Sequence, residues 1–299
     1  MAERVGFVGP GLMGHGAAKH ILLKGHKLAV LGHRNRVPVD DLVARGAAEV
    51  ADMAALAAAS DVILMFLPGA REVEATVAAL LPHIRPGMVV ADASTGDPDT
   101  TRRLGALLAA RGAAMVDAPV GRTPKEAEEG RLSSMLGGDP EAVARIRPIV
   151  ACYADTIVEC GPLGAALTVK LVNNFVSFSN AMIVGEAFAA ASRMGVDLAA
   201  LAAVIEAGGS NSVMFSWIAP WIRAGDDSLG RGRLGMGQGV LEAYRSLAHQ
   251  SGAPTAMVDA ASRTIAAIVA AGHGARFVPT LPGIMAEMAG APFRALDTP

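Results

Sequence analysis

A glycine-rich turn near the N-terminus constrains the fold of this chain more than any other feature of its sequence. The apolar run Val5 to Val8 leads into a G-x-G-x-x-G turn, and a helical stretch from Ala17 to Lys24 and a second apolar run from Lys27 to Leu31 follow. Such a motif by itself is often only a tight turn, but between a strand and a helix it is typical of dinucleotide binding. The glycines let the backbone approach a pyrophosphate, whose charge the helix N-terminus then stabilises. The residues expected to contact the cofactor here are Gly9, Gly11, Leu12, Met13 and Gly14.

Strand and helix candidates alternate through the rest of the first half. Buried-strand candidates are Val62 to Phe66, Met88 to Ala91 and Ala113 to Val116, and the first two follow helical stretches of suitable length. This alternation predicts a parallel α/β sheet of Rossmann type. Ligands in such sheets bind beyond the carboxyl ends of the strands. The strand-end loops therefore supply further site candidates: Leu67, Pro68, Ser94, Thr95 and residues 117–121, with Leu67, Pro68 and Thr95 expected at the cofactor.

The loop after the second strand bears on the choice between NAD and NADP. An NAD-binding domain usually has Asp or Glu there, which binds the ribose 2′-hydroxyl. This chain has Gly32-His33-Arg34-Asn35-Arg36, and no acid follows until Asp40. Two guanidinium groups and an amide suit a 2′-phosphate, which arginine can bind through two hydrogen bonds. The sequence favours NADP, with NAD as the alternative, and the cofactor candidates are His33, Arg34, Asn35 and Arg36. A solvated basic turn is the other interpretation.

The second half of the chain has a helical pattern. Leu163 to Met194 fits one long helix, with Gly161-Pro162 before it and Gly195 after it. Further helices are predicted at 198–206, 213–222, 240–251, 255–271 and about 284–289, and Gly, Ser and Asp interrupt the pattern most densely at 225–239. We therefore predict a Rossmann-type domain (1–161) and an all-α substrate and oligomerisation domain (162–299), joined by the long helix, with the active site in the cleft between them.

Lys170 is the strongest catalytic candidate. It lies in the apolar stretch Val169 to Val176, and Asn173, Asn174 and Ser177 share its stripe of the helix at offsets of 3, 4 and 7. An ammonium among apolar neighbours costs stability unless it is paired, and its pKa shifts readily, so such a lysine can serve as a proton donor. A lysine that extends its ammonium to solvent from the helix rim is the alternative.

Composition excludes several classes of protein. The chain has 299 residues, enough for about two domains, and a formal net charge of -2 without long charged runs, so nothing points to nucleic acid or an anionic membrane. Mean hydropathy is +0.39, but polar residues interrupt every apolar run, and the start of the chain leaves no room for a signal peptide. Cys152 and Cys160 lack metal-ligand or CxxC spacing, so we expect no metal site and two reduced, buried thiols. A cytoplasmic location is expected.

The motifs of this chain, taken in order, resemble those of the β-hydroxyacid dehydrogenase family, the relatives of 3-hydroxyisobutyrate dehydrogenase. The resemblance spans nearly the whole chain and rests on the glycine turn, 92–95, Asp117-Ala118-Pro119-Val120, Gly130-x-Leu132, Gly137-Gly138, Gly161-x-x-Gly164 and Lys170-x-x-Asn173-Asn174. It implies that Lys170 is the catalytic acid/base and that the substrate is held by Ser94, the loop Gly121, Arg122 and Thr123, and Asn174. Asn173 and Ser177, on the same helical stripe as Lys170, are further candidates for substrate binding. The long, Ala- and Met-rich helical half has more apolar surface than one small helical layer would hide, which predicts a homodimer or homotetramer, and the resemblance supports this.

The sequence departs from the family pattern at two main places. Gly121-Arg122-Thr123 stands where most members have Ser-Gly-Gly, and it resembles the loop of sulfolactaldehyde reductases, in which the corresponding arginine holds the sulfonate. Thr123-Pro124-Lys125-Glu126 also has the pattern of a capped helix start, which would add backbone amides to an anion site. An Arg122 that only closes the cleft through a salt bridge is the alternative. The family's late Lys-Asp pair, which contacts the cofactor, falls on Gly239-Val240.

These observations predict an NAD(P)-dependent oxidoreductase. The expected reaction interconverts a small β-hydroxy acid, or a hydroxy-sulfonate, and its aldehyde or semialdehyde by hydride transfer, with Lys170 as general acid/base. Two alternatives remain. A non-catalytic NADP-binding relative is compatible with the missing Lys-Asp pair, and an imine reductase-like enzyme shares the architecture but usually lacks the lysine.

Overall fold

The chain packs into two compact units, residues 1–170 and 171–299, and the division falls within one long helix directly after Lys170. The structure is a computed structural model that describes residues 3–32, 34–291 and 293. The predicted cofactor residue His33 lies outside the described residues. The packing division lies beyond the boundary at residue 161 that the sequence predicts.

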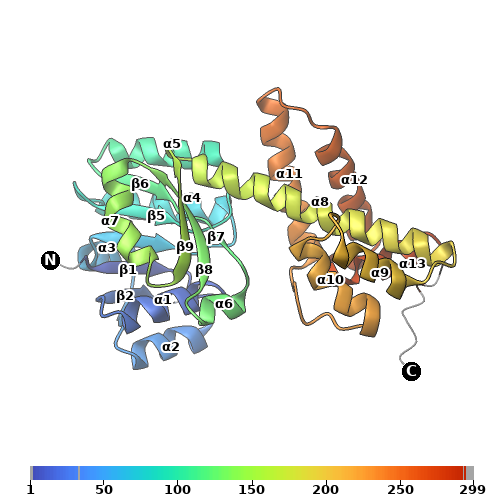
Figure 1. The fold of residues 1–299 in the computed structure, drawn as a ribbon. Coiled ribbons are helices and arrows are strands. Elements are labelled where there is room, and N and C mark those ends of the chain that lie inside the picture. Colours follow the sequence, from blue (N-terminus) through green and yellow to red (C-terminus); the bar gives the residue numbers. More distant parts are fainter. Residues whose placement is uncertain (1–2, 33, 292, 294–299) are drawn as a thin grey trace. The chain divides into compact units, whose positions relative to one another are not determined.

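The first unit is built on a twisted sheet whose main part is parallel (Figure 1). Its parallel strands lie in the order β3-β2-β1-β4-β5-β6, the order of a Rossmann fold. β8 runs antiparallel to β6 and β7, and β9 pairs with β8 in parallel. The strands are β1 Val5–Val8, β2 Leu28–Leu31, β3 Ala48–Val50, β4 Val62–Met65, β5 Val89–Asp92, β6 Ala114–Asp117, β7 Val120–Gly121, β8 Leu132–Gly138 and β9 Ala154–Gly161.

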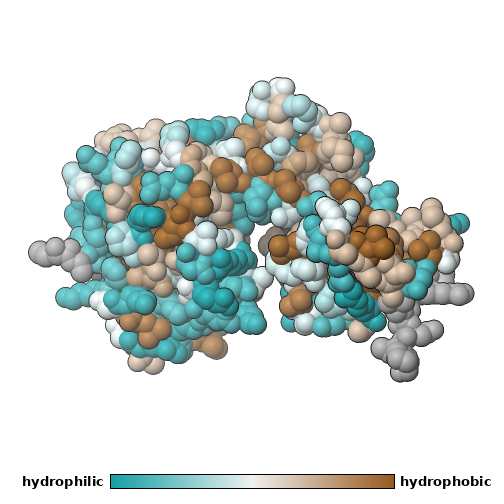
Figure 2. All heavy atoms as spheres, in the orientation of Figure 1, coloured by the Kyte–Doolittle hydropathy of each residue, from teal (hydrophilic) through white to brown (hydrophobic). Residues whose placement is uncertain are grey.

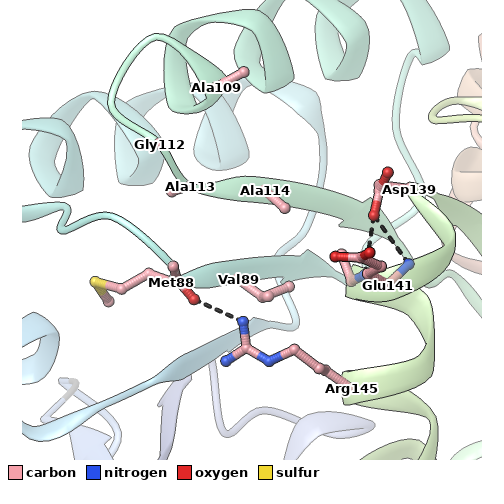
Figure 3. A pocket seen from close by; sticks show the side chains of 11 residues that line it. Met88, Val89, Ala109, Gly112, Ala113, Ala114, Asp139, Glu141 and Arg145 are labelled. Carbon is pink, nitrogen blue, oxygen red and sulfur yellow. Dashed lines mark hydrogen bonds between the residues drawn. The ribbon is translucent and has the colours of Figure 1, made fainter.

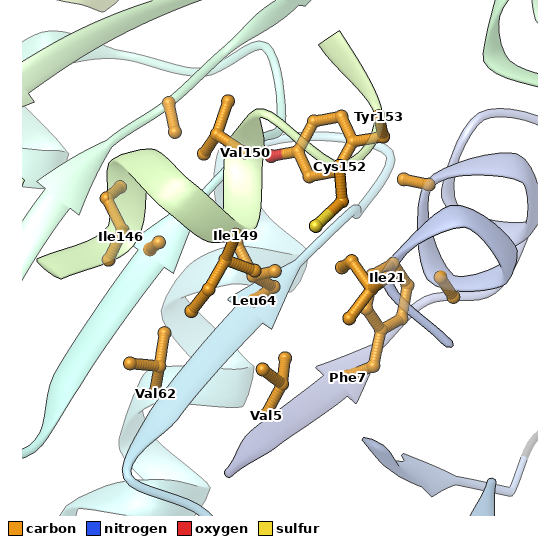
Figure 4. Close-up of a cluster of buried hydrophobic side chains, with 14 of the residues drawn as sticks. Val5, Phe7, Ile21, Val62, Leu64, Ile146, Ile149, Val150, Cys152 and Tyr153 are labelled. Carbon is orange, nitrogen blue, oxygen red and sulfur yellow. The ribbon is translucent and has the colours of Figure 1, made fainter. Parts of the chain in front are cut away.

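Helices cover this sheet, and apolar side chains fill the layers between them. Alternate residues of β1 and β4 face opposite cores: Phe7 and Leu64 lie in the cluster with Ile146 and Tyr153 (Figure 4), whereas Ile63 lies in the other. Strands buried on both faces are continuous apolar runs, which is why the sequence reveals them. The helices are α1 Gly14–Leu23, α2 Arg36–Ala44, α3 Met53–Ala59, α4 Ala70–Leu80, α5 Pro98–Ala109, α6 Pro124–Glu128 and α7 Pro140–Val150, with a 3-10 turn at Leu81–His83.

The second unit is helical, as the sequence predicts. Its core gathers apolar residues such as Phe188, Phe215 and Leu281, and its only described β structure is an isolated bridge between Arg233 and Phe277. The long helix is α8, Ala165–Arg193, and it enters this unit from the first one. The other helices are α9 Leu198–Ala207, α10 Val213–Ala224, α11 Leu234–Gln250, α12 Ala256–Ala270 and α13 Leu281–Met288, with 3-10 turns at His273–Ala275 and Val278–Thr280.

The sequence predicts the start of α11 too late, because two glycines near its start allow close packing and do not interrupt the helix. The sequence places a break at 225–239, whereas the helix begins at Leu234. A Cβ on Gly237 would lie 2.4 Å from a ring carbon of Phe178, and a Cβ on Gly235 would lie 3.2 Å from the carbonyl oxygen of Gly274. These glycines therefore allow close approach of neighbouring elements within the helical unit rather than ending a helix.

A matched pair of glycine substitutions in α11 tests this explanation. Gly239 is exposed, and a Cβ there would meet nothing within 4 Å. Gly239→Ala should therefore stabilise the chain by about 0.5–1 kcal/mol, since alanine is the better helix former. Gly237→Ala should lower the free energy of unfolding instead, because its Cβ would overlap Phe178. Thermal melts of both variants check this, and a stabilising Gly237→Ala would contradict it.

Polar residues interrupt every apolar run of the sequence, yet α8 is long and apolar enough to cross a membrane by length and composition alone. Core helices of soluble proteins pass the same test when they are mostly buried, and 33% of the most apolar window of α8 is buried.

The expectation of two buried thiols needs correction. Both cysteines are free, but only Cys152 is buried. Cys160 is partly exposed because it lies on β9, which pairs with β8 alone.

Candidate active site

The glycine turn has the backbone geometry of a nucleotide-binding loop. Gly9 has φ +89°, and a Cβ there would lie 2.2 Å from the carbonyl oxygen of Phe66. A Cβ on Gly14 would lie 2.2 Å from the carbonyl oxygen of Gly9, so two of the glycines are required for close packing. Gly11 faces open space, and Leu12 is 81% exposed. The turn therefore leaves room in front of the N-terminus of α1 for a pyrophosphate, which fits a dinucleotide.

Ser94 ties together the carboxyl ends of β4 and β5. Its hydroxyl accepts a hydrogen bond from the Leu67 amide (2.9 Å), and its own amide donates to Oδ1 of Asp92 (2.9 Å). Ser94 is buried, Thr95 is partly buried and Pro68 is exposed. Burial raises the pKa of Asp92 to about 6, hydrogen bonds from Ser94 oppose this, and the nearby Asp117 raises the pKa further. The predicted residues Leu67 and Ser94 are thus in contact at the expected edge of the sheet.

Asp117 holds the start of the long helix. Its carboxylate, at the end of β6, accepts hydrogen bonds from the amides of Gly164 and Leu167, each 2.8 Å long. Burial raises its pKa, and these two bonds oppose the rise. A Cβ on Gly137 would lie 2.5 Å from Oδ1 of Asp117. The first amides of α8 lack partners within the helix, so this carboxylate fixes the helix that carries Lys170.

Lys170 lies on α8, six residues after Gly164. It is partly buried, and desolvation lowers its pKa from 10.5 to about 8. Within the described residues, no hydrogen bond or ion pair engages its ammonium. Asn174 and Ser177 are partly buried, Asn173 is exposed, and all three follow Lys170 on the same helix. The structure therefore shows a lysine with the lowered pKa that a proton donor or acceptor needs near neutral pH.

Arg122 makes a salt bridge in this structure. It has φ +76°, the one positive value for a described residue other than glycine. Its guanidinium donates to Oδ2 of Asp155 (2.7 Å), to the hydroxyl of Thr156 (3.2 Å) and to the carbonyl of Arg131. A salt bridge of Arg122, the alternative to an anion site, is thus present. Its partner, Asp155 on β9, lies in the first unit together with Arg122, so this salt bridge does not join the two units. No hydrogen bond joins Arg122 to Ser94 or Lys170 among the described residues.

The capped helix start predicted after Arg122 is confirmed. Thr123 and Glu126 form a capping box, with the Thr123 amide donating to the Glu126 carboxylate (3.0 Å), and Pro124 is the first residue of α6. α6 has only five residues, so its aligned peptide dipoles are few. The backbone amides that this short helix could add to an anion site are therefore few.

The basic loop after β2 differs from its prediction in one important respect. Arg34 is exposed and makes no ion pair within the described part of the chain. Asn35 accepts a hydrogen bond from the Val37 amide (3.3 Å) and so caps α2. Arg36, expected to face a phosphate, instead forms ion pairs with Asp40 and Glu49. The sequence did not reveal Glu49 as a partner of Arg36, because Glu49 lies on the neighbouring strand β3.

A surface pocket elsewhere in the first unit is not at the ligand-binding edge. Its lining includes Met88, Val89, Ala114 and Arg145 (Figure 3). Val89 and Ala114 are the first residues of β5 and β6, so the pocket lies at the amino ends of these strands. Arg145 there donates to the carbonyl of Gly87 and pairs with Glu3. These bonds give it a structural role.

Comparison with known proteins agrees with the fold and the glycine turn. The family model "NAD binding domain of 6-phosphogluconate dehydrogenase" matches residues 4–161, and "NAD-binding of NADP-dependent 3-hydroxyisobutyrate dehydrogenase" matches residues 164–277. The NAD-dependent L-serine dehydrogenase of Pseudomonas aeruginosa is 32% identical over 73% of this chain and 74% of its own length. The 3-sulfolactaldehyde reductase of Escherichia coli K12 is 34% identical over 58% of this chain and 59% of its own length.

A solved structure supports the same fold. The 3-hydroxyisobutyrate dehydrogenase of Mycobacterium tuberculosis, solved with L-serine, has a TM-score of 0.87 and 24% identity, covering 95% of this chain and 99% of its own. A Rossmann-type domain with an open glycine turn, followed by this helical domain, defines an NAD(P)-dependent oxidoreductase. The chain belongs to the β-hydroxyacid dehydrogenase family, whose members resemble 3-hydroxyisobutyrate dehydrogenase.

Proposed function

We propose that this chain reduces a small semialdehyde that carries an acid group to the corresponding β-hydroxy acid, and catalyses the reverse oxidation, with Lys170 as general acid/base. The observation that carries the proposal is the lysine with a pKa lowered to about 8 by desolvation, on a helix anchored at the end of β6. The nicotinamide cofactor supplies or accepts the hydride. The ammonium of Lys170 gives a proton to the carbonyl oxygen and stabilises the negative charge that develops there.

The acid group of the substrate needs a cation of its own, and Arg122 is the residue proposed to bind it. Its guanidinium can form two charge-assisted hydrogen bonds with a sulfonate or carboxylate. The 3-sulfolactaldehyde reductase of E. coli is among the relatives of this chain, which supports a sulfonated aldehyde as one substrate to test. Asn174 and Ser177, on the stripe of Lys170, are proposed to hydrogen-bond the substrate.

A kinetic screen tests the proposed function. Succinic semialdehyde, methylmalonate semialdehyde, tartronate semialdehyde, glyoxylate and sulfolactaldehyde would each be offered with NADPH and with NADH. We expect cofactor oxidation with at least one of them. Tight NADPH binding without any turnover would favour the non-catalytic alternative, for which the absence of the family's Lys-Asp pair at Gly239-Val240 is the argument.

NADP is the proposed cofactor, and Arg34 the proposed partner of its 2′-phosphate. Arg34 is exposed and has no ion-pair partner among the described residues. Arg34→Ala should lower kcat/KM for NADPH by about 10–100-fold, the scale of a hydrogen bond to a charged group, and should leave kcat/KM for NADH nearly unchanged. Equal losses with both cofactors would show that Arg34 does not contact the 2′-phosphate.

A homodimer or homotetramer is proposed from the exposed side of α8. Val169, Val172, Val176 and Ile183 repeat at helical spacing and are 43%, 41%, 50% and 56% exposed. Figure 2 shows apolar patches along the course of this helix. A second copy of the chain would bury them. Light scattering at micromolar concentration should give a mass of at least twice 30.5 kDa, and a monomer of that mass would refute the proposal.

A further inference from the structure

No acid lies directly after β2 in the sequence, and the neighbouring strand supplies one instead. Glu49 is the central residue of β3 and pairs in register with Val30 of β2. A Cβ built on Gly32 would lie 2.6 Å from Oε1 of Glu49, so this carboxylate lies directly against the first residue after β2. Rossmann domains hold the adenosine ribose beyond the carboxyl end of this strand. Glu49 therefore places a negative charge beside the expected ribose position.

Glu49 also determines what Arg36 can bind. Nη1 of Arg36 donates to Oε1 of Glu49 (2.5 Å) and Nη2 donates to Oε2 (2.9 Å), while Nη2 also donates to Oδ1 of Asp40 (2.7 Å). Both terminal nitrogens of the guanidinium are thus engaged by carboxylates. Arg36 can bind a phosphate through two adjacent N–H groups only if it releases Glu49 or Asp40. The hydrogen bonds from Arg36 lower the pKa of Glu49, so its carboxylate is ionised at neutral pH.

The balance of charge at this edge follows from these contacts. Arg36 is neutralised by two acids, and Arg34 is the cation that remains in the described part of the loop. We infer that Glu49 is a cofactor-specificity residue: it opposes a 2′-phosphate by its own charge and by holding Arg36, and so leaves the chain able to bind NADH as well as NADPH. This inference rests on the proposed function, since it concerns the cofactor of that reaction.

Nucleotide binding by the intact chain, measured by calorimetry, tests the inference without catalysis. The probes are 2′,5′-ADP, which carries the 2′-phosphate, and 5′-AMP, which does not. Glu49→Gln keeps the shape of the side chain and removes its charge, and should lower the Kd for 2′,5′-ADP about 10-fold while changing that for 5′-AMP less than about 2-fold. The pair is about half exposed, so the variant should fold normally.

Glu74→Gln is the matched control. Glu74 also pairs with an arginine, Arg103, at 2.5 Å and on the surface of the same unit, but it lies on α4. The Glu74→Gln variant should leave the Kd for 2′,5′-ADP and the Kd for 5′-AMP unchanged. An unchanged or raised Kd for 2′,5′-ADP in Glu49→Gln would overturn the inference, since Glu49 would then be neutral or would position Arg36 for the phosphate. Failure of the unmodified chain to bind NADPH, NADH or either probe would overturn the proposed function and this inference with it.

Discussion

Replacing Lys170 with alanine is expected to lower kcat about 10²–10⁴-fold while leaving the affinity for NADPH nearly unchanged. The ammonium is the proposed proton donor to the carbonyl oxygen, and its removal leaves only water for that role. Steady-state kinetics and fluorescence titration with NADPH separate the two effects. A loss of less than tenfold in kcat would show that another group transfers the proton.

The pH dependence of the two reaction directions gives an independent check of the same residue. Desolvation lowers the pKa of Lys170 to about 8, so its protonated form predominates below that pH. Reduction requires the protonated form, and its kcat/KM should fall as pH rises through about 8. Oxidation requires the neutral amine and should accelerate over the same range. Lys170→Arg, which stays protonated, should lose both transitions.

Removal of the Lys170 ammonium should stabilise the folded chain, although it abolishes the proposed proton transfer. A lysine whose pKa is lower in the folded than in the unfolded chain binds its proton less tightly when folded. The resulting loss in the free energy of unfolding is fully present below about pH 8. It disappears as pH rises toward 10.5. Lys170→Met, which keeps an apolar side chain of similar length, should therefore raise the Tm at pH 7, and the gain should shrink at alkaline pH. An inactive variant that melts lower would mean that Lys170 mainly supports the fold.

The parts of the fold that were predictable from the sequence are those with local signals. β1 and β4 are continuous apolar runs because both faces of the sheet are covered, and the long helix lies between glycine signals at its two ends. The glycine turn was predictable because backbone contact with Phe66 requires glycine at position 9. Such features depend on neighbours in sequence or on the residue type itself.

The contacts that the sequence did not reveal are between residues far apart in the chain. Asp117 accepts a hydrogen bond from Gly164, 47 residues later and directly before α8; Asp155 pairs with an arginine 33 residues before it; and Glu49 on β3 pairs with Arg36, 13 residues before it at the start of α2. Each is a single carboxylate whose partner depends on the pairing of strands. A scan for an acid directly after β2 could not find Glu49, because the sheet and not the loop brings it there.

Arg122 is expected to have the second largest effect, and on KM rather than on kcat. Arg122→Ala should raise KM for an acidic aldehyde by about 10–100-fold, on the scale of hydrogen bonds to a charged group. Arg122→Gly is the better-controlled variant, because glycine adopts the φ of +76° without strain and the helix cap at Thr123 is retained. An uncharged aldehyde of similar size should be reduced equally well by the unmodified chain and by the two Arg122 variants.

A substitution of Asp155 tests in the opposite direction whether Arg122 binds the acid group of the substrate. It holds the Arg122 guanidinium in a half-exposed ion pair, an interaction that contributes at most about 1 kcal/mol, so an anionic substrate can displace it. Asp155→Asn should remove this competition and lower KM for the acidic substrate severalfold, whereas the Arg122 variants raise it. Since the ionised Asp155 carboxylate is the competitor, the KM of the neutral aldehyde should not respond. If the Asp155 and Arg122 variants raised KM alike, for charged and neutral substrates, the ion pair would serve only to hold β9 to the loop, and the acid group would be bound elsewhere.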